Sequence, residues 1–192
     1  GQYQVRGVPA QALTLAEIAD RAYSDNLPET IDSGLEASAY FRPEVVYPFG
    51  VHIAVVEIER ETGLVAIREY YSVDDCGPRI SPNLVEGQIH GGLAQGIAQA
   101  LLEEMTYTQD GQLVTGSLMD YALPRATQFP EFVTDSTETP TFHNPLGAKG
   151  IGEAATIGST PAIANAVMDA LKPLGVRHLD VPLKPEKIWR AM

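Results

Sequence analysis

The residues that could do chemistry in this 192-residue chain fall into two stretches, of which the first is a predicted helix over residues 84–105. Four of its residues follow at intervals of four, three and four, which places them on one helix face: Gln88, Gly92, Gln95 and Gln99. No charged residue lies between Glu86 and Glu103, which indicates that this face is buried. A carboxamide both donates and accepts hydrogen bonds, so it suits the polar edge of a pterin or purine.

Beyond its first turn the same helix contains three glycines, Gly91, Gly92 and Gly96, each of which costs about 1 kcal/mol relative to alanine in a helix interior. Nothing in local propensity offsets a total of about 3 kcal/mol, so another group must approach the backbone closely. Two interpretations remain open. Either a second helix or strand packs on the glycines, with hydrogen-bonded glutamines in the core, or a heterocycle binds there. Spacing alone favours packing.

The second stretch is the glycine-rich segment over residues 144–158, which we expect to be a loop. Glycines let the backbone approach a ligand, and they leave N–H groups free to bind an oxyanion. Within it, Glu153 has no adjacent charge. If this carboxyl is buried, desolvation raises its pKa towards the range that a general base needs. A solvent-facing glutamate in a flexible loop is the simpler alternative.

The spacing Gly150-x-Gly152-x-x-Ala155 also fits a dinucleotide-binding fingerprint. That fingerprint must follow a strand within a βαβ unit, whereas residues 140–149 form a proline-bearing loop. The neighbouring Asp74 and Asp75 are expected to lie in a solvated turn. We expect no metal bound by side chains, because the histidines lack ligand spacing with one another and with the single cysteine: His52, His90, His143, His178 and Cys76.

A β-hairpin is the clearest prediction for the elements that position these residues. Val, Ile and Tyr are abundant over residues 49–59 and 64–73, and a short turn that contains Gly63 separates the two runs. Alternation along the first strand places four residues on one face: His52, Ala54, Val56 and Ile58.

Three helices are predicted, over residues 12–23, 84–105 and 162–171. Each begins with a pair typical of a helix start: Thr14 with Glu17, Asn83 with Glu86, and Thr160 with Pro161. Two further strands are predicted over residues 132–136 and 176–181, and a helical turn over residues 185–192. Helices mixed with an antiparallel hairpin predict an α+β fold.

The composition narrows the classes of function. A net charge of −12 disfavours nucleic acid and anionic membranes as partners, because binding phosphates needs clustered Lys and Arg. No apolar run approaches the roughly 18 residues of a membrane span. A single cysteine, Cys76, excludes an internal disulfide and fits a cytoplasmic location. The chain begins at Gly1 without an initiator Met, so we expect a processed chain or an excised piece.

Several collinear segments resemble the large subunits of molybdenum hydroxylases, the family of xanthine dehydrogenase, aldehyde oxidase and aerobic carbon monoxide dehydrogenase. They cover most of residues 45–192, and the likeness is strongest to the bacterial carbon monoxide dehydrogenase-like branch. The segments are Asp75-Cys76-Gly77, Ser81-Pro82, Val85 to Gly92, Gln95-Gly96, Asp120 to Pro124, Asn144 to Glu153, and the ending Lys187 to Met192.

The resemblance implies a molybdenum-pyranopterin cofactor, including its cytosine dinucleotide form. It implies that Gln88 contacts the pterin and that Glu153 is the catalytic glutamate, which acts as general base. The full set of cofactor-binding residues that it implies is Gln88, Gly91, Gly92, Lys149, Gly150 and Gly152. No protein side chain is expected to ligate molybdenum, because the dithiolene of the cofactor does so.

The implied enzyme oxidises an aldehyde, an N-heterocycle or CO with water as the oxygen source, and iron–sulfur and FAD partners carry the electrons away. Residues 1–192 would be the C-terminal segment of its cofactor-binding domain, with a helix-and-loop lead-in over residues 1–45 and the cofactor-binding core over residues 46–192. We therefore expect the chain alone to bind no cofactor tightly and to be inactive without the rest of the large subunit. A dinucleotide-binding domain and a non-catalytic structural module remain the alternatives.

Overall fold

The computed structural model describes residues 1–192, except for the side chain of Pro9, and the chain divides into two compact units, residues 1–42 and 43–192. The first unit is a small antiparallel hairpin of β1 (Gln2–Val5) and β2 (Val8–Thr14), followed by α1 (Leu15–Ala22). The Thr14 side chain accepts a hydrogen bond from the Glu17 N–H, and the Glu17 side chain accepts one from the Thr14 N–H. The predicted capping box is therefore confirmed.

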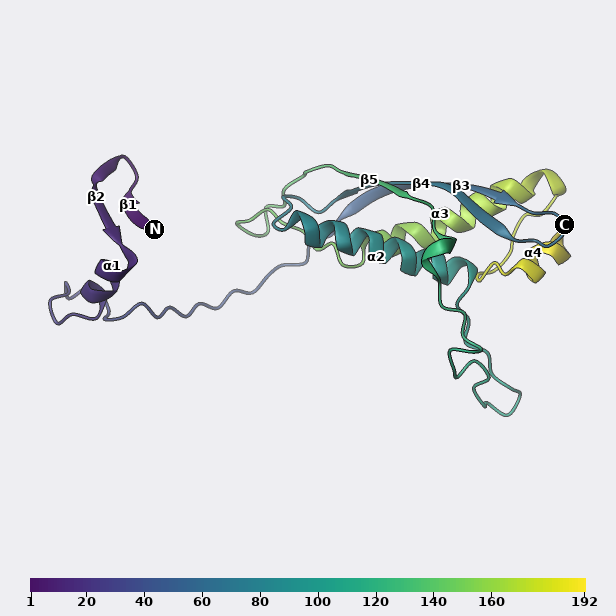
Figure 1. The fold of residues 1–192 in the computed structure, drawn as a ribbon, viewed down its shortest axis with the longest axis horizontal. Coiled ribbons are helices and arrows are strands. Elements are labelled where there is room, and N and C mark those ends of the chain that lie inside the picture. Colours follow the sequence, from purple (N-terminus) through teal and green to yellow (C-terminus); the bar gives the residue numbers. More distant parts are fainter. The chain divides into compact units, whose positions relative to one another are not determined.

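A three-stranded sheet in the order β3-β4-β5 forms one layer of the second unit (Figure 1). Strands β3 (Phe49–Ile58) and β4 (Val65–Asp75) pair antiparallel from Phe49 opposite Asp75 to Ile58 opposite Val65, which confirms the predicted hairpin. Strand β5 (Phe132–Ser136) lies parallel to β4, so the chain crosses over between these two strands.

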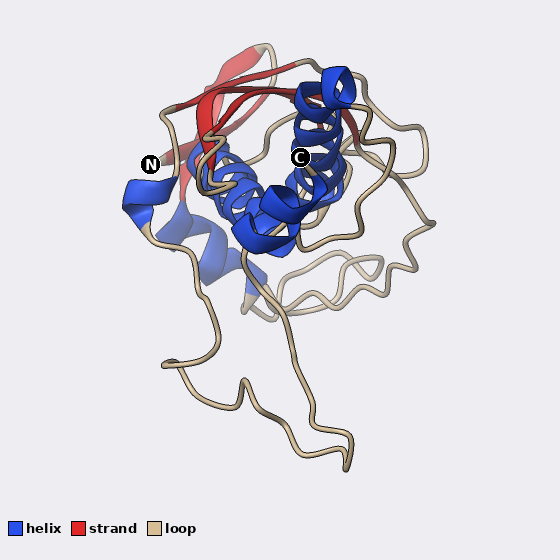
Figure 2. Ribbon diagram, turned by 90° about the vertical axis from the view of Figure 1, so that its right-hand side faces the viewer, coloured by secondary structure: helices blue, strands red, loops and turns tan.

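Two long helices, α2 (Pro82–Leu101) and α3 (Ala154–Leu171), pack against each other and cover one face of the sheet (Figure 2). A short helix α4 (Pro185–Ala191) ends the chain, and 3₁₀ turns occur at Ala126–Gln128 and Lys172–Leu174. The largest buried side chains of the core come from β4, α2, α3, the segment before α4 and α4 itself: Tyr70, Leu93, Ile163, Val167, Leu171, Leu183 and Ile188. The mixture of elements confirms the α+β class.

Several predicted boundaries are wrong. Helix α2 begins at Pro82 after Ser81, so Asn83 lies inside the helix, and it ends at Leu101 rather than near residue 105. Helix α3 begins at Ala154, so Pro161 lies inside the helix instead of at its start. Contacts of the first two turns of α3 with the middle of α2 stabilise this helical stretch although Pro161 cannot donate a backbone hydrogen bond.

The strand predicted over residues 176–181 is also absent from the described chain. Val176 and Leu179 both pack against the core, but their spacing of three does not match the alternation of a strand. None of the described helices is long and apolar enough to span a membrane.

Candidate cofactor site

The crossing of α2 and α3 explains two of the helix glycines. A Cβ atom on Gly92 would lie 2.8 Å from the Cβ of Ala155 and 3.0 Å from the amide nitrogen of Thr156. A Cβ on Gly96 would clash with Ser159 Oγ and lie 2.8 Å from the carbonyl oxygen of Thr156. The packing interpretation therefore accounts for Gly92 and Gly96, because α3 approaches the α2 backbone at these positions.

Hydroxyl groups of α3 reinforce this crossing. Ser159 Oγ donates to the carbonyl oxygen of Gly92 at 3.3 Å, and Thr160 Oγ1 lies 3.2 Å from the carbonyl oxygen of Gly96. Thr160 Oγ1 is also 3.2 Å from Gln99 Oε1. The side-chain contacts fix the position of α3 relative to α2, and with it the position of the segment that leads into α3.

The glutamine face of α2 differs from the prediction. Gly92 is buried, but Gln88, Gln95 and Gln99 are exposed in this chain, so the predicted burial of the whole face is wrong. The reason is that α2 buries a different stripe against the sheet and α3, which consists of Ile89, Leu93, Ile97, Ala100 and Leu101. The uncharged glutamine side of the helix is left open to another group.

Gln88 meets the second predicted stretch. A Cβ on Gly152 would lie 3.6 Å from Gln88 Oε1, so the carboxamide stands beside the segment that enters α3. Glu153 follows at the N-cap position of α3, where its side chain makes no capping hydrogen bond and is exposed. Added Cβ atoms on Gly91 and Gly150 would meet no heavy atom within 4 Å outside their own chain neighbourhood. These small residues therefore border open space.

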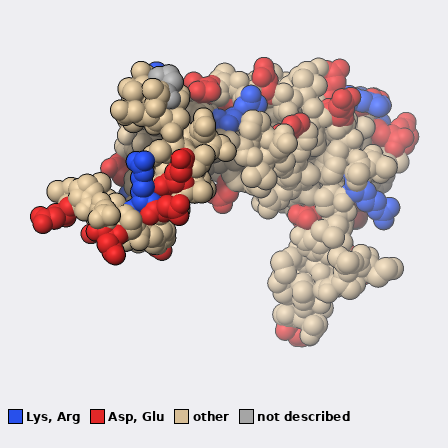
Figure 3. Space-filling view, turned by 60° about the vertical axis from the view of Figure 1, so that its left-hand side comes forward, with Lys and Arg blue, Asp and Glu red and all other residues tan. Residues whose placement is uncertain are grey.

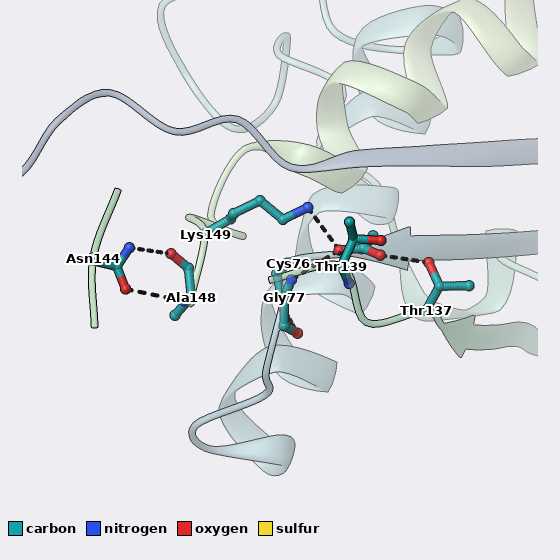
Figure 4. Close-up of polar contacts among 8 residues, drawn as sticks. Cys76, Gly77, Thr137, Thr139, Asn144, Ala148 and Lys149 are labelled. Carbon is teal, nitrogen blue, oxygen red and sulfur yellow. Dashed lines mark hydrogen bonds and ion pairs between the residues drawn. The ribbon is translucent and has the colours of Figure 1, made fainter. Parts of the chain in front are cut away.

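A buried ion pair holds the other end of this loop. Figure 4 shows the Lys149 side chain reaching towards the end of β4. Lys149 Nζ lies 2.8 Å from Asp75 Oδ1, and the two side chains are only 7% and 0% exposed. Asp75 Oδ1 also accepts hydrogen bonds from the N–H groups of Gly77, at 3.0 Å, and Thr139, at 3.1 Å. Asp75 Oδ2 accepts one from Thr137 Oγ1 at 2.8 Å.

These contacts decide the charge of Asp75. Burial by itself would raise the pKa of this carboxyl, but the hydrogen bonds from Lys149, Gly77, Thr139 and Thr137 outweigh it and hold the pKa well below its usual range. The solvated turn predicted for Asp74 and Asp75 is therefore wrong. Both carboxylates are buried at the end of β4, and both have partners inside the fold.

Backbone geometry shapes the loop between these anchors. The Asn144 side chain donates to the carbonyl oxygen of Ala148 at 2.8 Å and accepts from the Ala148 N–H at 3.2 Å (Figure 4). The Lys149 N–H donates to the carbonyl oxygen of Cys76 at 2.7 Å. Gly77 and Gly147 adopt positive φ angles of 67° and 69°, and a Cβ on Gly77 would clash with the Gly147 carbonyl.

Asp74 makes a separate contact within the sheet. His52 Nε2 lies 3.3 Å from Asp74 Oδ1, and His52 Nδ1 lies 2.9 Å from the Tyr70 hydroxyl. Burial and the Asp74 carboxylate raise the pKa of the Tyr70 phenol. Gly158 of α3 packs on the His52 ring, where an added Cβ would come within 2.6 Å. This network joins β3, β4 and α3 without reaching the loop at Lys149.

The structure thus brings Gln88 and Gly152 together, with Glu153 next in the chain, and it adds a group that the sequence analysis missed: Asp75, Thr137, Thr139 and Asn144. Alternation along β4 gives no signal for Asp75, because it places Asp74 on the buried face with Tyr70 and Ser72 and Asp75 on the opposite face. Thr137 and Thr139 carry no signal either, because their contacts depend on how β5 pairs with β4.

The fold and the site together define a class of protein. It is an α+β domain in which a helix amide and a glycine loop border open space. Residues 1–130 match the family described as the molybdopterin cofactor-binding domain. The chain therefore belongs to that family, and the resemblance inferred from the sequence is confirmed. The matched range includes Gln88, Gly91 and Gly92 and ends before Lys149 and Glu153.

Individual relatives align over the whole chain. It is 43% identical over 192 residues to the carbon monoxide dehydrogenase large chain of Hydrogenophaga pseudoflava, and 38% identical over 194 residues to the nicotine 6-hydroxylase large subunit of Paenarthrobacter nicotinovorans. Each alignment covers 100% of this chain and 24% of the relative. The structure of quinoline 2-oxidoreductase from Pseudomonas putida 86 superposes with a TM-score of 0.92 at 43% identity, over 100% of this chain and 25% of that one.

The residues at the site fit the cofactor of the family. A pterin edge needs neutral donors and acceptors, which the exposed Gln88 amide supplies, and it needs room, which Gly91 and Gly150 leave. Glu153, the single carboxylate of the glycine-rich segment, directly follows Gly152 in the chain. A dinucleotide fingerprint does not fit, because residues 137–153 separate β5 from α3 and no strand leads directly into the glycines in this described part of the chain.

Proposed function

We propose that this chain is the C-terminal cofactor-binding portion of a molybdenum hydroxylase large subunit. The observation that carries the proposal is the approach of Gln88 Oε1 to Gly152, at 3.6 Å from the position of an added Cβ. It joins the amide of α2 to the loop that ends in Glu153. The amide side of the proposed site can then bind a heterocycle, while the carboxylate on the loop side accepts a proton.

Each residue has a distinct task in this proposal. The Gln88 carboxamide would hydrogen-bond the pterin edge, and Gly91 would leave room beside it. Gly92 contributes indirectly, because it lets α3 pack closely on α2 and so sets where the loop before α3 lies. Lys149, Gly150 and Gly152 form the loop beside the molybdenum, which would have no ligand from these side chains. When bound, the cofactor supplies the acceptor for the two electrons of the oxidation.

Glu153 acts as the general base. Hydroxylation of a C–H bond, or oxidation of CO to CO₂, consumes one water and releases two protons and two electrons. A positioned carboxylate accelerates such a reaction by accepting a proton from the water-derived nucleophile, which typically contributes 10²–10⁴-fold. Glu153 is exposed in this chain, so the remainder of the subunit would have to cover it during turnover.

The substrate is an aldehyde, an N-heterocycle or CO, and iron–sulfur and FAD partners receive the electrons. Support for this range comes from the relatives, whose names include a carbon monoxide dehydrogenase, a nicotine hydroxylase and a quinoline oxidoreductase. The chain spans 24% of the length of its first relatives, so the rest of the large subunit supplies the other cofactor contacts and the loop that selects the substrate.

The test is Glu153→Gln in the assembled enzyme. We expect turnover to fall by about two orders of magnitude or more, because the neutral amide cannot accept the proton. Molybdenum content should stay at the wild-type level, since Glu153 does not hold the cofactor in this proposal. Glu61→Gln, in the exposed turn between β3 and β4, is the matched control and should keep full turnover. Near-normal turnover in Glu153→Gln contradicts the assignment.

A further inference from the structure

The Asp75–Lys149 ion pair joins segments that are far apart in the sequence. Asp75 ends β4, Thr137 and Thr139 follow β5, and Lys149 belongs to the glycine loop. Lys149 Nζ also lies 4.3 Å from the centroid of the Phe49 ring, at the start of β3. All three strands of the sheet therefore connect to one position in the loop, four residues before Glu153.

Stability alone gives little reason for such a pair. Removing two charges from water is costly, and well-packed apolar replacements for buried ion pairs are often neutral or stabilising. What an ion pair adds is direction, because the Lys149 ammonium must meet a carboxylate that three other donors already hold in place. The main effect of the contact is therefore to fix the position of Lys149, and its effect on the stability of the fold is smaller.

A second anchor lies on the other side of Glu153. Ala155 is completely buried, and its Cβ packs where Gly92 leaves room in α2. Only five residues link the two anchors, and two of them are Gly150 and Gly152. Glycine restricts the backbone least of all residues, so this short stretch depends on its ends for its position.

We propose that Asp75 and Lys149 are positioning residues that place the Glu153 carboxylate for proton transfer. The inference rests on the proposed function of Glu153 and gives the Lys149 side chain an indirect role, through Asp75, rather than a contact with the cofactor. Misplacing a reacting group by about 1 Å can reduce a rate about 10²-fold. The effect of breaking the pair should therefore be seen in kcat.

The experiment uses the complete enzyme with Lys149→Met and the paired variant Asp75→Asn/Lys149→Met. The paired variant removes both charges and so leaves no unpaired buried charge. It therefore tests the positioning role even if the lone buried carboxylate of Asp75 destabilises Lys149→Met. We expect kcat to fall about 10- to 100-fold in both, with KM changed less than about threefold. Molybdenum content should be unchanged, and hydrogen exchange at residues 150–153 should become faster. Arg68→Met, which removes the exposed ion pair with Glu57, should alter none of these.

A double-mutant cycle with Glu153→Gln separates the two proposals. If Lys149 acts through Glu153, Lys149→Met should reduce the residual turnover of Glu153→Gln by less than about threefold. Three results overturn the positioning role: losses of kcat that multiply fully in the double mutant, an unchanged kcat in the paired variant, or a loss of molybdenum in proportion to activity. In each of these cases, a low turnover of Glu153→Gln leaves the proposed function standing. Normal turnover of Glu153→Gln instead removes the proposed function and the positioning role with it.

Discussion

At the scale of single residues, the proposed site depends on neutral polar groups. Gln88 is an uncharged amide on a helix that carries no charge from Gly87 to Leu102, and its oxygen faces Gly152 across the site. In a chain with a net charge of −12, an anionic cofactor is better met by amides and backbone N–H groups than by the numerous carboxylates. The buried cation at Lys149 is already neutralised by Asp75.

Replacing Gln88 with Ala should weaken the binding of the cofactor. The change removes one donor and one acceptor from the pterin edge and leaves groups on the cofactor without partners. We expect the assembled enzyme to lose molybdenum content or to shift its molybdenum reduction potential, as measured by metal analysis and redox titration. Gln95→Ala is the matched control, since Gln95 lies on the same side of α2 almost two turns further on. If neither quantity changes in Gln88→Ala, the amide serves packing alone.

How far the sequence predicts single residues depends on whether their contacts are local. Thr14 and Glu17 form the expected capping box because both partners lie within one turn. Asp75 was misjudged because its donors, Thr139 and Lys149, are 64 and 74 residues away in the chain. Their approach is set by the parallel pairing of β5 with β4, which no short pattern reveals.

At the scale of elements, the contact between α2 and α3 positions both halves of the proposed site. Gly92 and Gly96 let the two helices approach closely, and the hydroxyls of Ser159 and Thr160 donate hydrogen bonds to the carbonyl oxygens of these two glycines. The sequence predicted that something must approach these glycines, but not that α3 would extend back to Ala154. The local signal of Thr160 and Pro161 marked a helix start, and the tertiary contact overrode it.

Gly96→Ala should destabilise this crossing. Its added methyl would press on Ser159 Oγ and on the Thr156 carbonyl, and backbone cannot move aside as a flexible side chain can. Overpacking of this kind costs about 1–3 kcal/mol, so thermal unfolding of the complete enzyme should begin at a lower temperature.

Gly87→Ala is the control for this substitution, because a Cβ at position 87 meets no heavy atom within 4 Å. With no clash to oppose it, the better helix propensity of alanine should leave stability unchanged or raise it by up to about 1 kcal/mol. Equal melting temperatures for Gly96→Ala and the wild type would show that α3 can shift away from α2 without cost.

At the scale of the whole molecule, the chain leaves apolar surface uncovered. Side chains on the sheet face opposite the helices are exposed, and they come from all three strands: Val51, Ile53, Val55, Tyr71, Val73 and Val133. Acidic side chains are scattered between wide uncharged areas on the face drawn in Figure 3. Large exposed apolar patches mark contact surfaces, and the chain spans only 24% of the length of its first relatives.

The 192-residue chain on its own should therefore lack activity. It contributes one amide, a glycine loop and one carboxylate to a cofactor whose other contacts, together with the substrate loop, come from the remainder of the subunit in our proposal. We expect no reduction of an artificial electron acceptor when the isolated chain is mixed with cofactor and with an aldehyde, an N-heterocycle or CO. Assembly with the remainder of the large subunit should restore turnover together with molybdenum content. Substrate-dependent dye reduction by the isolated chain would show that these residues form a complete site.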